Sequence, residues 1–414
     1  EDLADTAIGW LRDLRAVDPD KPFFLYLATG ACHSPHQAPP EWIERYAGQF
    51  DAGWDVWRDA TFARQLDAGI LPPHTRLSDR PDWVPAWDSL PPDARQVFAR
   101  FMEAFAGFLT HTDAQVGRVI AELERLGDLD DTIVLVLSDN GASSEGGPNG
   151  SLNDARTWNM IGTSVEEAHR RLTEIGGPTI HNNYPWGWTV AGNTPFRRWK
   201  REVHEGGVAD PLIVHWPAGL ADRVPGDDGF RRQYVHAIDL VPTLLEVIGL
   251  DEPGEVAGVP QRPIEGTSFA PTLTDPGAED RHTVQYYEMF GCRALYLDGW
   301  KAVTYHQIQF DEPGLDQVGW ELYDLSADPS ETDDLAAAEP ERLQAMIERW
   351  WVEAARHQVL PLDNRPFADF VFERPHSVEP RNRYVLWPDR PPIPEAVAPN
   401  VKNRTHRVSA SVVV

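Results

Sequence analysis

The chain has few cysteines, no long apolar run and little positive charge. Only Cys32 and Cys292 occur among 414 residues, too few for a framework of disulfides. No apolar run approaches the ~18 to 20 residues of a membrane-spanning helix. The longest candidate, TIVLVLS at 132–138, is flanked by charged and turn residues, so we expect no membrane partner.

The shortage of positive charge narrows the choice of partners. Lysine and arginine number 37 against 65 acidic residues, which leaves a net charge of −28. Such a chain would repel a phosphate backbone, and no basic stripe with interleaved aromatic residues offsets the charge, so nucleic acid is not expected. A small anionic substrate would have to be captured by a few local cations.

What the chain does contain is a large apolar fraction, 42%, distributed in an α/β pattern. Residues 1–14 form an amphipathic pattern, PFFLYLA at 22–28 is typical of a strand buried on both faces, and 92–127 predicts a long helix interrupted near Gly107. The strand TIVLVLS follows. Alternating strand and helix favours a parallel sheet, whose ligand site lies beyond the carboxyl ends of the strands.

Later segments divide the chain further. PLIVHWP at 211–217 and the helix-like 239–250 continue the α/β pattern, and they are followed by alternating segments with an Asp298-Gly299 hairpin signal and a helix at 339–356. We predict an α/β unit over 1–280, an antiparallel sheet with a helix over 281–370, a proline-rich linker over 371–404, and the first strand of a truncated β-rich domain over 405–414.

Asp139 and Asn140 form the first candidate site. They directly follow the predicted strand 132–138, and Gly141 behind them permits a sharp turn. A carboxylate and an amide oxygen are ligands that calcium prefers, although calcium needs about six to eight oxygens. An ordinary turn is the alternative for an Asp-Asn-Gly triplet.

His33 and Lys200 are the second pair of candidates. His33 lies in ACHSPHQAPP after the first strand, where prolines restrict the backbone, and a fixed imidazole can bind an anion or protonate a leaving oxygen. Lys200 lies in RRWKREVHEGG, where four cations in five residues could hold an anion. A hydrogen-bonded loop histidine is the alternative for His33, and we expect the neighbouring arginines to form salt bridges.

Taken in order, these segments resemble the arylsulfatases, members of the alkaline phosphatase superfamily. The resemblance rests on PFFLYLA with its loop histidine, SDNG, the lysine before EGG, PLIVHWP, DLVPTLLEVIG and LYDLSADPSETDDLA, and it covers roughly residues 1–365. It implies an α/β fold of the alkaline phosphatase type, a mixed or parallel sheet sandwiched by helices with a small C-terminal antiparallel sheet. It also implies an enzyme that hydrolyses a sulfate ester, with either a small molecule or a carbohydrate as the esterified alcohol.

The resemblance assigns roles to the four candidate residues. It implies that His33 and Lys200 contact the sulfate ester and help the leaving oxygen, and that Asp139 and Asn140 bind Ca²⁺. In this family the nucleophile is a formylglycine, made from the first residue of a C/S-x-P-x-R motif. Cys32 has its proline one place late and no arginine, and Cys292 fails as well. We interpret both as apolar packing thiols.

The family's nucleophile and its N-terminal metal ligands are therefore expected upstream of residue 1, and this fragment alone is predicted to be inactive. A phosphonate or phosphate monoester hydrolase of the same superfamily and a non-catalytic remnant are the alternatives. The tryptophans of the loops 50–90 and 142–194 could stack on a substrate ring or simply pack. The sequence leaves the compartment open between the cytoplasm and the periplasm of a bacterium, and it leaves the oligomeric state open.

Overall fold

The computed structural model describes most of the chain. The described residues are 1–158, 161–224, 226–306, 314, 317–365, 382–386, 399, 401 and 405–411. Within them, no helix has both the length and the apolar character needed to cross a membrane.

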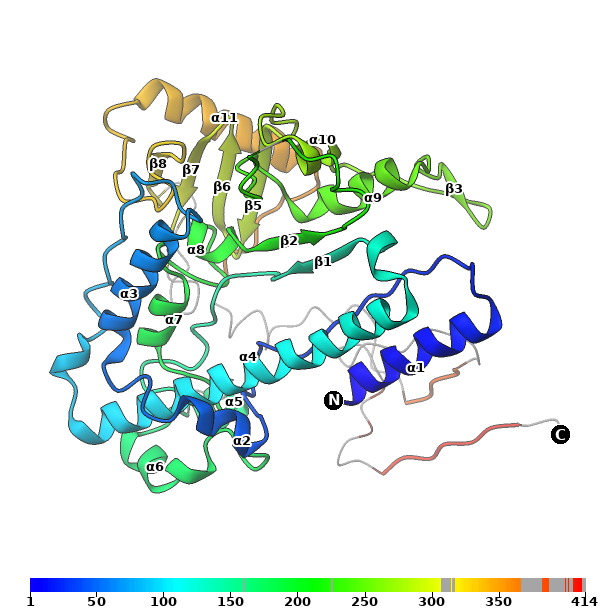
Figure 1. Cartoon of the computed structure of the whole chain (residues 1–414). Helices are drawn as coiled ribbons and strands as arrows, with labels where there is room; N and C mark the ends of the chain where they lie inside the picture. Colours follow the sequence, from blue (N-terminus) through cyan, green and yellow to red (C-terminus); the bar gives the residue numbers. More distant parts are fainter. Residues whose placement is uncertain are drawn as a thin grey trace.

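Two helices form one side of the molecule (Figure 1). α1 (Asp2–Val17) packs along the second half of α4 (Pro92–Leu126), and buried side chains of both meet in one apolar cluster that includes Leu11 and Leu123. α4 starts with a proline in its first turn and ends at Gly127, whose φ of 81° suits glycine. Both helices were predicted from their apolar spacing, and both are confirmed.

α4 continues without interruption through Gly107, contrary to the predicted break. The glycine is needed for close packing, since a Cβ at this position would lie 2.7 Å from the Cα of Ile43 in α2 (Pro40–Ile43). A glycine within a helical pattern thus marks the crossing of two helices here.

The main apolar core lies around the first half of α4. It contains Trp54, Trp87 and Trp188, whose rings contact one another edge to face or at a tilt. These three tryptophans are almost fully buried, so packing and not substrate stacking accounts for them. They come from α3 (Gly53–Asp67), η2 (Trp87–Ser89) and α7 (Trp186–Gly192).

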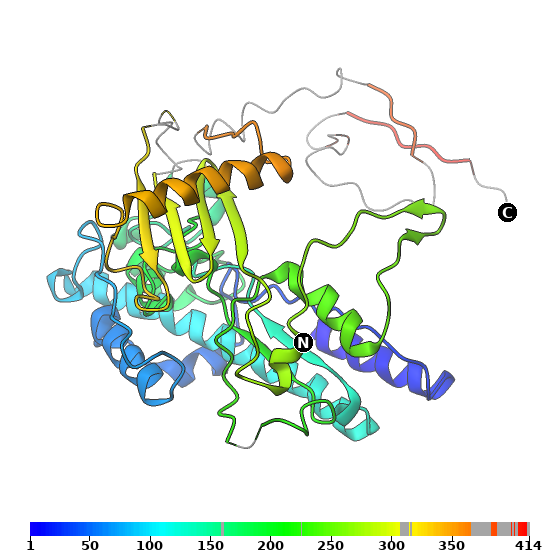
Figure 2. The ribbon, with the colours of Figure 1, turned by 90° about the horizontal axis from the view of Figure 1, so that it is seen from above.

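The C-terminal sheet has four antiparallel strands in the order β5-β6-β7-β8. The strands are β5 (Val284–Met289), β6 (Cys292–Leu297), β7 (Trp300–Thr304) and β8 (Trp320–Asp324). α11 (Pro340–Arg356) covers one face through Met346 and Trp350 (Figure 2). Asp298 and Gly299 have φ of 47° and 84° in the β6–β7 turn, which confirms the predicted hairpin.

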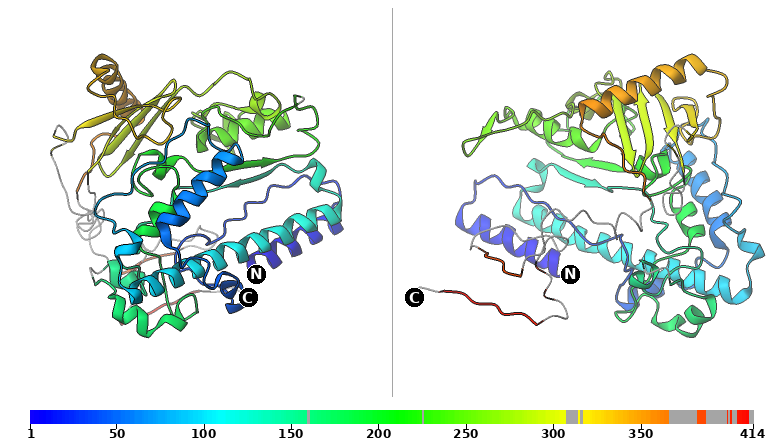
Figure 3. Two further views of the ribbon diagram at one scale, coloured as in Figure 1. Left: turned by 60° about the vertical axis from the view of Figure 1, so that its left-hand side comes forward. Right: turned by 180° about the vertical axis from the view of Figure 1, so that it is seen from behind.

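β1 (Val134–Leu137) and β2 (Leu212–His215) form a separate pair between this sheet and the α1–α4 layer (Figure 3). They pair antiparallel, with Leu135 opposite Val214, an arrangement that a mixed sheet includes. Residues 22–28 were predicted as a buried strand but belong to no strand, and their side chains alternate. Phe23, Leu25 and Leu27 pack against the α1–α4 cluster, while Phe24 and Tyr26 are about four-fifths exposed at 78% and 81%.

The remaining elements connect these layers. They are η1 (Glu44–Tyr46), η3 (Leu129–Asp131), α5 (Asp154–Trp158), α6 (Val165–Arg170), η4 (Leu172–Glu174), α8 (Glu205–Val208), η5 (Ala237–Asp239), α9 (Leu240–Ile248), β3 (Glu255–Val256), β4 (Val259–Pro260) and α10 (Ala270–Thr274).

The structure describes only part of the predicted linker and of the predicted C-terminal strand. Most of the linker 371–404 lies outside the described residues, as do 412–414. Residues 405–411 are exposed and belong to no strand, so a further β-rich domain stays a prediction. Of the two thiols, Cys292 is buried as expected, but Cys32 is exposed, and its interpretation as a packing residue was wrong.

Candidate functional site

The turn after β1 lies directly against α8. A Cβ on Gly141 would be 1.8 Å from the carbonyl oxygen of Gly206, so only glycine permits this approach. The amide of Gly141 donates to the carbonyl of Gly207 at 3.3 Å. The SDNG and EGG segments, more than 60 residues apart in sequence, therefore meet through their glycines.

Lys200 is held beside the same turn by backbone and side-chain hydrogen bonds. Its amide donates to the carbonyl of Ala142 at 3.1 Å. Asn193, which is buried, bridges the two segments, since its Oδ1 accepts from the amide of Ala142 and its Nδ2 donates to the carbonyl of Arg198, both at 2.8 Å. A Cβ on Gly206 would lie 2.2 Å from the carbonyl oxygen of Arg197, so the EGG glycines admit the loop that carries Lys200.

His33 reaches this region from a loop whose next residues are anchored to the rest of the protein. The hydroxyl of Ser34 donates to Asp154, and His36 is buried between the rings of Phe105 and Tyr184. Burial lowers the pKa of His36 to about 3, and so His36 is a neutral core residue. The side chain of His33 itself is 60% exposed.

The protonation geometry of His33 follows from its hydrogen bond. Its Nδ1 lies 2.8 Å from the carbonyl oxygen of Ser34, which can only accept, so Nδ1 carries a hydrogen. In the neutral ring Nε2 is then the unprotonated nitrogen, and it is the atom that gains a proton when the ring becomes charged.

Glu145 is the point at which the candidate side chains converge. Its Oε2 lies 3.5 Å from Nζ of Lys200 and 3.7 Å from Nε2 of His33. Arg201 donates to Oε1, and the hydroxyl of Ser143 donates to Oε2 at 3.0 Å. The structure thus brings the two predicted catalytic residues together on one carboxylate.

The other charged residues of the RRWKREVHEGG segment have structural partners. Arg197 lies 3.5 Å from Glu321 and Arg198 lies 3.6 Å from Glu202, so the expected salt bridges are present. His204 is fully buried 2.9 Å from Glu321, and burial lowers its pKa to about 4. Val203 packs on the face of the C-terminal sheet opposite α11, which anchors the loop.

Asp139 and Asn140 lie at the start of the turn, and the side-chain Nδ2 of Asn140 donates to Oδ1 of Asp139 at 2.9 Å. This hydrogen bond leaves the amide oxygen and the exposed carboxylate of Asp139 as possible cation ligands. Burial, together with the charges of Asp139 and Glu205, raises the pKa of Asp210 to about 6, so acidic groups gather here. Within the described residues, no three His, Cys, Asp or Glu side chains form a metal cluster. The donors fit one part of a calcium site.

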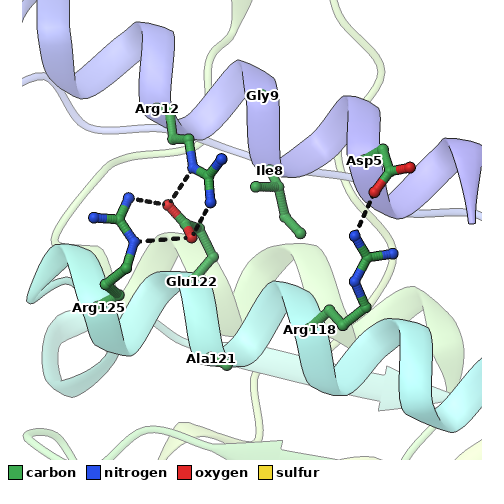
Figure 4. Close-up of a pocket in the computed structure, with 8 residues that line it drawn as sticks. All are labelled: Asp5, Ile8, Gly9, Arg12, Arg118, Ala121, Glu122 and Arg125. Atoms are coloured by element: carbon green, nitrogen blue, oxygen red, sulfur yellow. Dashed lines mark hydrogen bonds and ion pairs between the residues drawn. The ribbon is translucent and has the colours of Figure 1, made fainter.

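A depression between α1 and α4, lined by Asp5, Ile8, Gly9, Arg12, Arg118, Ala121, Glu122 and Arg125, is separate from this region (Figure 4). Two ion pairs cross between the helices, Arg12 with Glu122 and Asp5 with Arg118, and Arg125 pairs with Glu122 within α4. Hydrogen bonds from the two arginines hold the pKa of Glu122 below its usual range. The depression therefore lies along the packing interface of α1 and α4, and its charged groups hold the two helices together.

Comparison with known proteins identifies the chain's relatives. The family described as Sulfatase matches residues 1–250. The chain belongs to the sulfatase family. The family described as N-sulphoglucosamine sulphohydrolase, C-terminal, matches residues 197–355, which include the C-terminal sheet and most of α11.

Individual relatives agree with this assignment. The sulfatase chain is 30% identical over 366 residues to an uncharacterised sulfatase of Schizosaccharomyces pombe, covering 87% of this chain and 62% of the relative. It is 27% identical over 264 residues to the arylsulfatase of Klebsiella aerogenes, covering 62% and 53%. The solved structure of YidJ from Bacteroides fragilis matches with a TM-score of 0.50 at 18% identity, covering 90% and 60%, and shares the fold. The sulfatase chain spans less than two thirds of these relatives.

Two residues that contact the candidate side chains or their loop were not predicted from the sequence, Glu145 and Asn193. Glu145 follows SDNG by only a few residues, yet its neighbours His33 and Lys200 are far away in sequence. Asn193 carries no charge and lies in a loop without a motif. The position of Glu145, a few residues after the candidate metal ligands Asp139 and Asn140, could have suggested a role for it. No feature of the sequence distinguishes Asn193 from other asparagines.

Proposed function

We propose that this chain is the larger part of an enzyme that hydrolyses sulfate esters, with a formylglycine nucleophile supplied from outside residues 1–414. The observation that supports the proposal is the convergence of Lys200 and His33 beside the Asp139–Asn140 turn. The relatives that are named as arylsulfatases support the class of reaction.

In this proposal Lys200 and His33 have different tasks. Lys200 is 20% exposed and fixed through its backbone, so its ammonium can neutralise negative charge that builds up on the sulfate oxygens. His33, when protonated on Nε2, can give that proton to the ester oxygen as the S–O bond breaks and the alcohol leaves. Its Nδ1 stays on the carbonyl of Ser34 and orients the ring.

Asp139 and Asn140 are the proposed ligands of a calcium ion, with further ligands from outside the chain. When bound, calcium would polarise the sulfate oxygens. The chain's own contribution is to hold the two oxygen donors at the end of β1, next to Lys200.

The first prediction tests the reaction class and the role of Lys200 in the complete protein that contains this chain. We expect hydrolysis of an aryl sulfate in preference to an aryl phosphate when the two compete, and a loss of about 10²-fold or more in kcat for Lys200→Ala. The control is Lys21→Ala, which removes an exposed lysine far from Lys200 in sequence. This variant should leave the rate unchanged. Preference for the aryl phosphate would favour a phosphate monoester hydrolase, and absence of both activities would favour a non-catalytic remnant.

A further inference from the structure

Glu145 places a negative charge at a site proposed for an anion. Its side chain is 14% exposed and lies within 4 Å of charged or ionisable groups on Lys200, Arg201 and His33. Mutual repulsion between a carboxylate and an anionic ester would weaken binding, so this arrangement needs a physical reason.

The carboxylate cannot easily swing away. A Cβ on the next residue, Gly146, would lie 2.0 Å from the carbonyl oxygen of Tyr184, so the backbone is packed tightly there. The amide of Trp186 donates to the carbonyl of Gly147 at 3.0 Å. Arg201 and Ser143 take hydrogen-bonding positions on the carboxylate itself. Glu145 is therefore a fixed charge.

The formal charge of the cluster follows from its members. Burial alone would raise the pKa of Glu145, but the charges of Arg201 and Lys200 outweigh it and lower that pKa, so the carboxylate is ionised. Lys200 and Arg201 contribute two positive charges and Glu145 one negative charge. These three side chains sum to a single positive charge, to which a proton on His33 or a bound cation would add, so Glu145 lowers the positive charge of the site by one unit in either case.

A sulfate monoester carries one negative charge, whereas a phosphate monoester carries about two above its second pKa of ~6. We propose that Glu145 is a specificity-determining residue that lowers the positive charge of the site by one unit and so selects singly charged esters over doubly charged ones. The inference rests on the proposed function of the same site. Specificity arises here by a repulsive element, which weakens the wrong ligand more than the right one.

The test is the ratio of kcat/KM for an aryl phosphate to that for an aryl sulfate at about pH 8, above the second phosphate pKa, in the complete protein. Glu145→Gln should raise this ratio by about tenfold or more, because one unit charge a few ångströms away acts more strongly on a dianion. Glu145→Asp keeps the charge and should leave the ratio within about threefold. Glu145→Ala serves as a second neutral variant should the glutamine variant fold poorly.

Glu174→Gln is the matched control, since Glu174 is also a carboxylate paired with an arginine, Arg171 at 2.7 Å, but it lies outside the site. Its ratio should not change. A fall of both activities of Glu145→Gln in equal proportion would overturn the inference, because Glu145 would then only position Lys200 and Arg201. If the wild-type protein hydrolyses no aryl sulfate, the proposed function fails instead.

Discussion

Glu202 is a buried carboxylate in the loop that carries Lys200. It is 8% exposed and lies 3.6 Å from Arg198, yet burial outweighs the arginine charge and raises its pKa from 4.5 to about 7. The native state therefore holds this proton more tightly than the unfolded state does. Its stabilising contribution is complete below pH 4.5 and is lost as the pH rises through about 7.

Replacement of Glu202 by glutamine should remove this pH dependence. Between about pH 4.5 and 8, we expect the free energy of unfolding of Glu202→Gln to rise relative to wild type by up to about 3 kcal/mol. Urea unfolding at a series of pH values measures this difference. Parallel stability curves for the two proteins would show that the Glu202 pKa is not raised.

At the scale of elements, α4 contains two glycines that should respond in opposite ways to alanine. A Cβ at Gly107 would press on the backbone of Ile43 in α2, whereas a Cβ at Gly117 would meet no atom within 4 Å. We expect Gly107→Ala to lower the free energy of unfolding by about 1–3 kcal/mol by overpacking. Gly117→Ala should raise it by about 0.5–1 kcal/mol through helix propensity.

Thermal and urea unfolding of the two variants, with helix content monitored by circular dichroism, distinguish packing from propensity. If both alanines stabilise the protein, α2 does not cross α4 as closely as the structure shows. The predicted helix was correct in extent, but the sequence pattern indicated a break where the structure has a crossing point.

At the scale of the whole molecule, residues 1–414 alone should hydrolyse no aryl sulfate. The proposed site has Lys200 and His33, but neither cysteine fits the nucleophile motif, and Cys292 is buried. The same chain extended upstream and matured should be active. Side-by-side assays of the two purified proteins check this, and measurable turnover by residues 1–414 would contradict it.

The sequence predicted the structure best where the local conformation depends on residues close together in the chain. Apolar spacing predicted α1 and α4, and Asp298-Gly299 predicted the β6–β7 turn, because such elements are governed by local backbone preferences. The sulfatase family followed from an ordered set of short segments. The roles of Asp139, Asn140, His33 and Lys200 stay proposals.

Only the tertiary structure decided how distant segments meet. The antiparallel pairing of β1 with β2, the exposed side chains of 22–28 and the bridge through Asn193 depend on contacts between residues far apart in sequence. The gathering of His33, Lys200 and Arg201 around Glu145 is of the same kind. The sequence by itself determined which groups could carry the chemistry, while packing decided which charges stand close enough to act on one another.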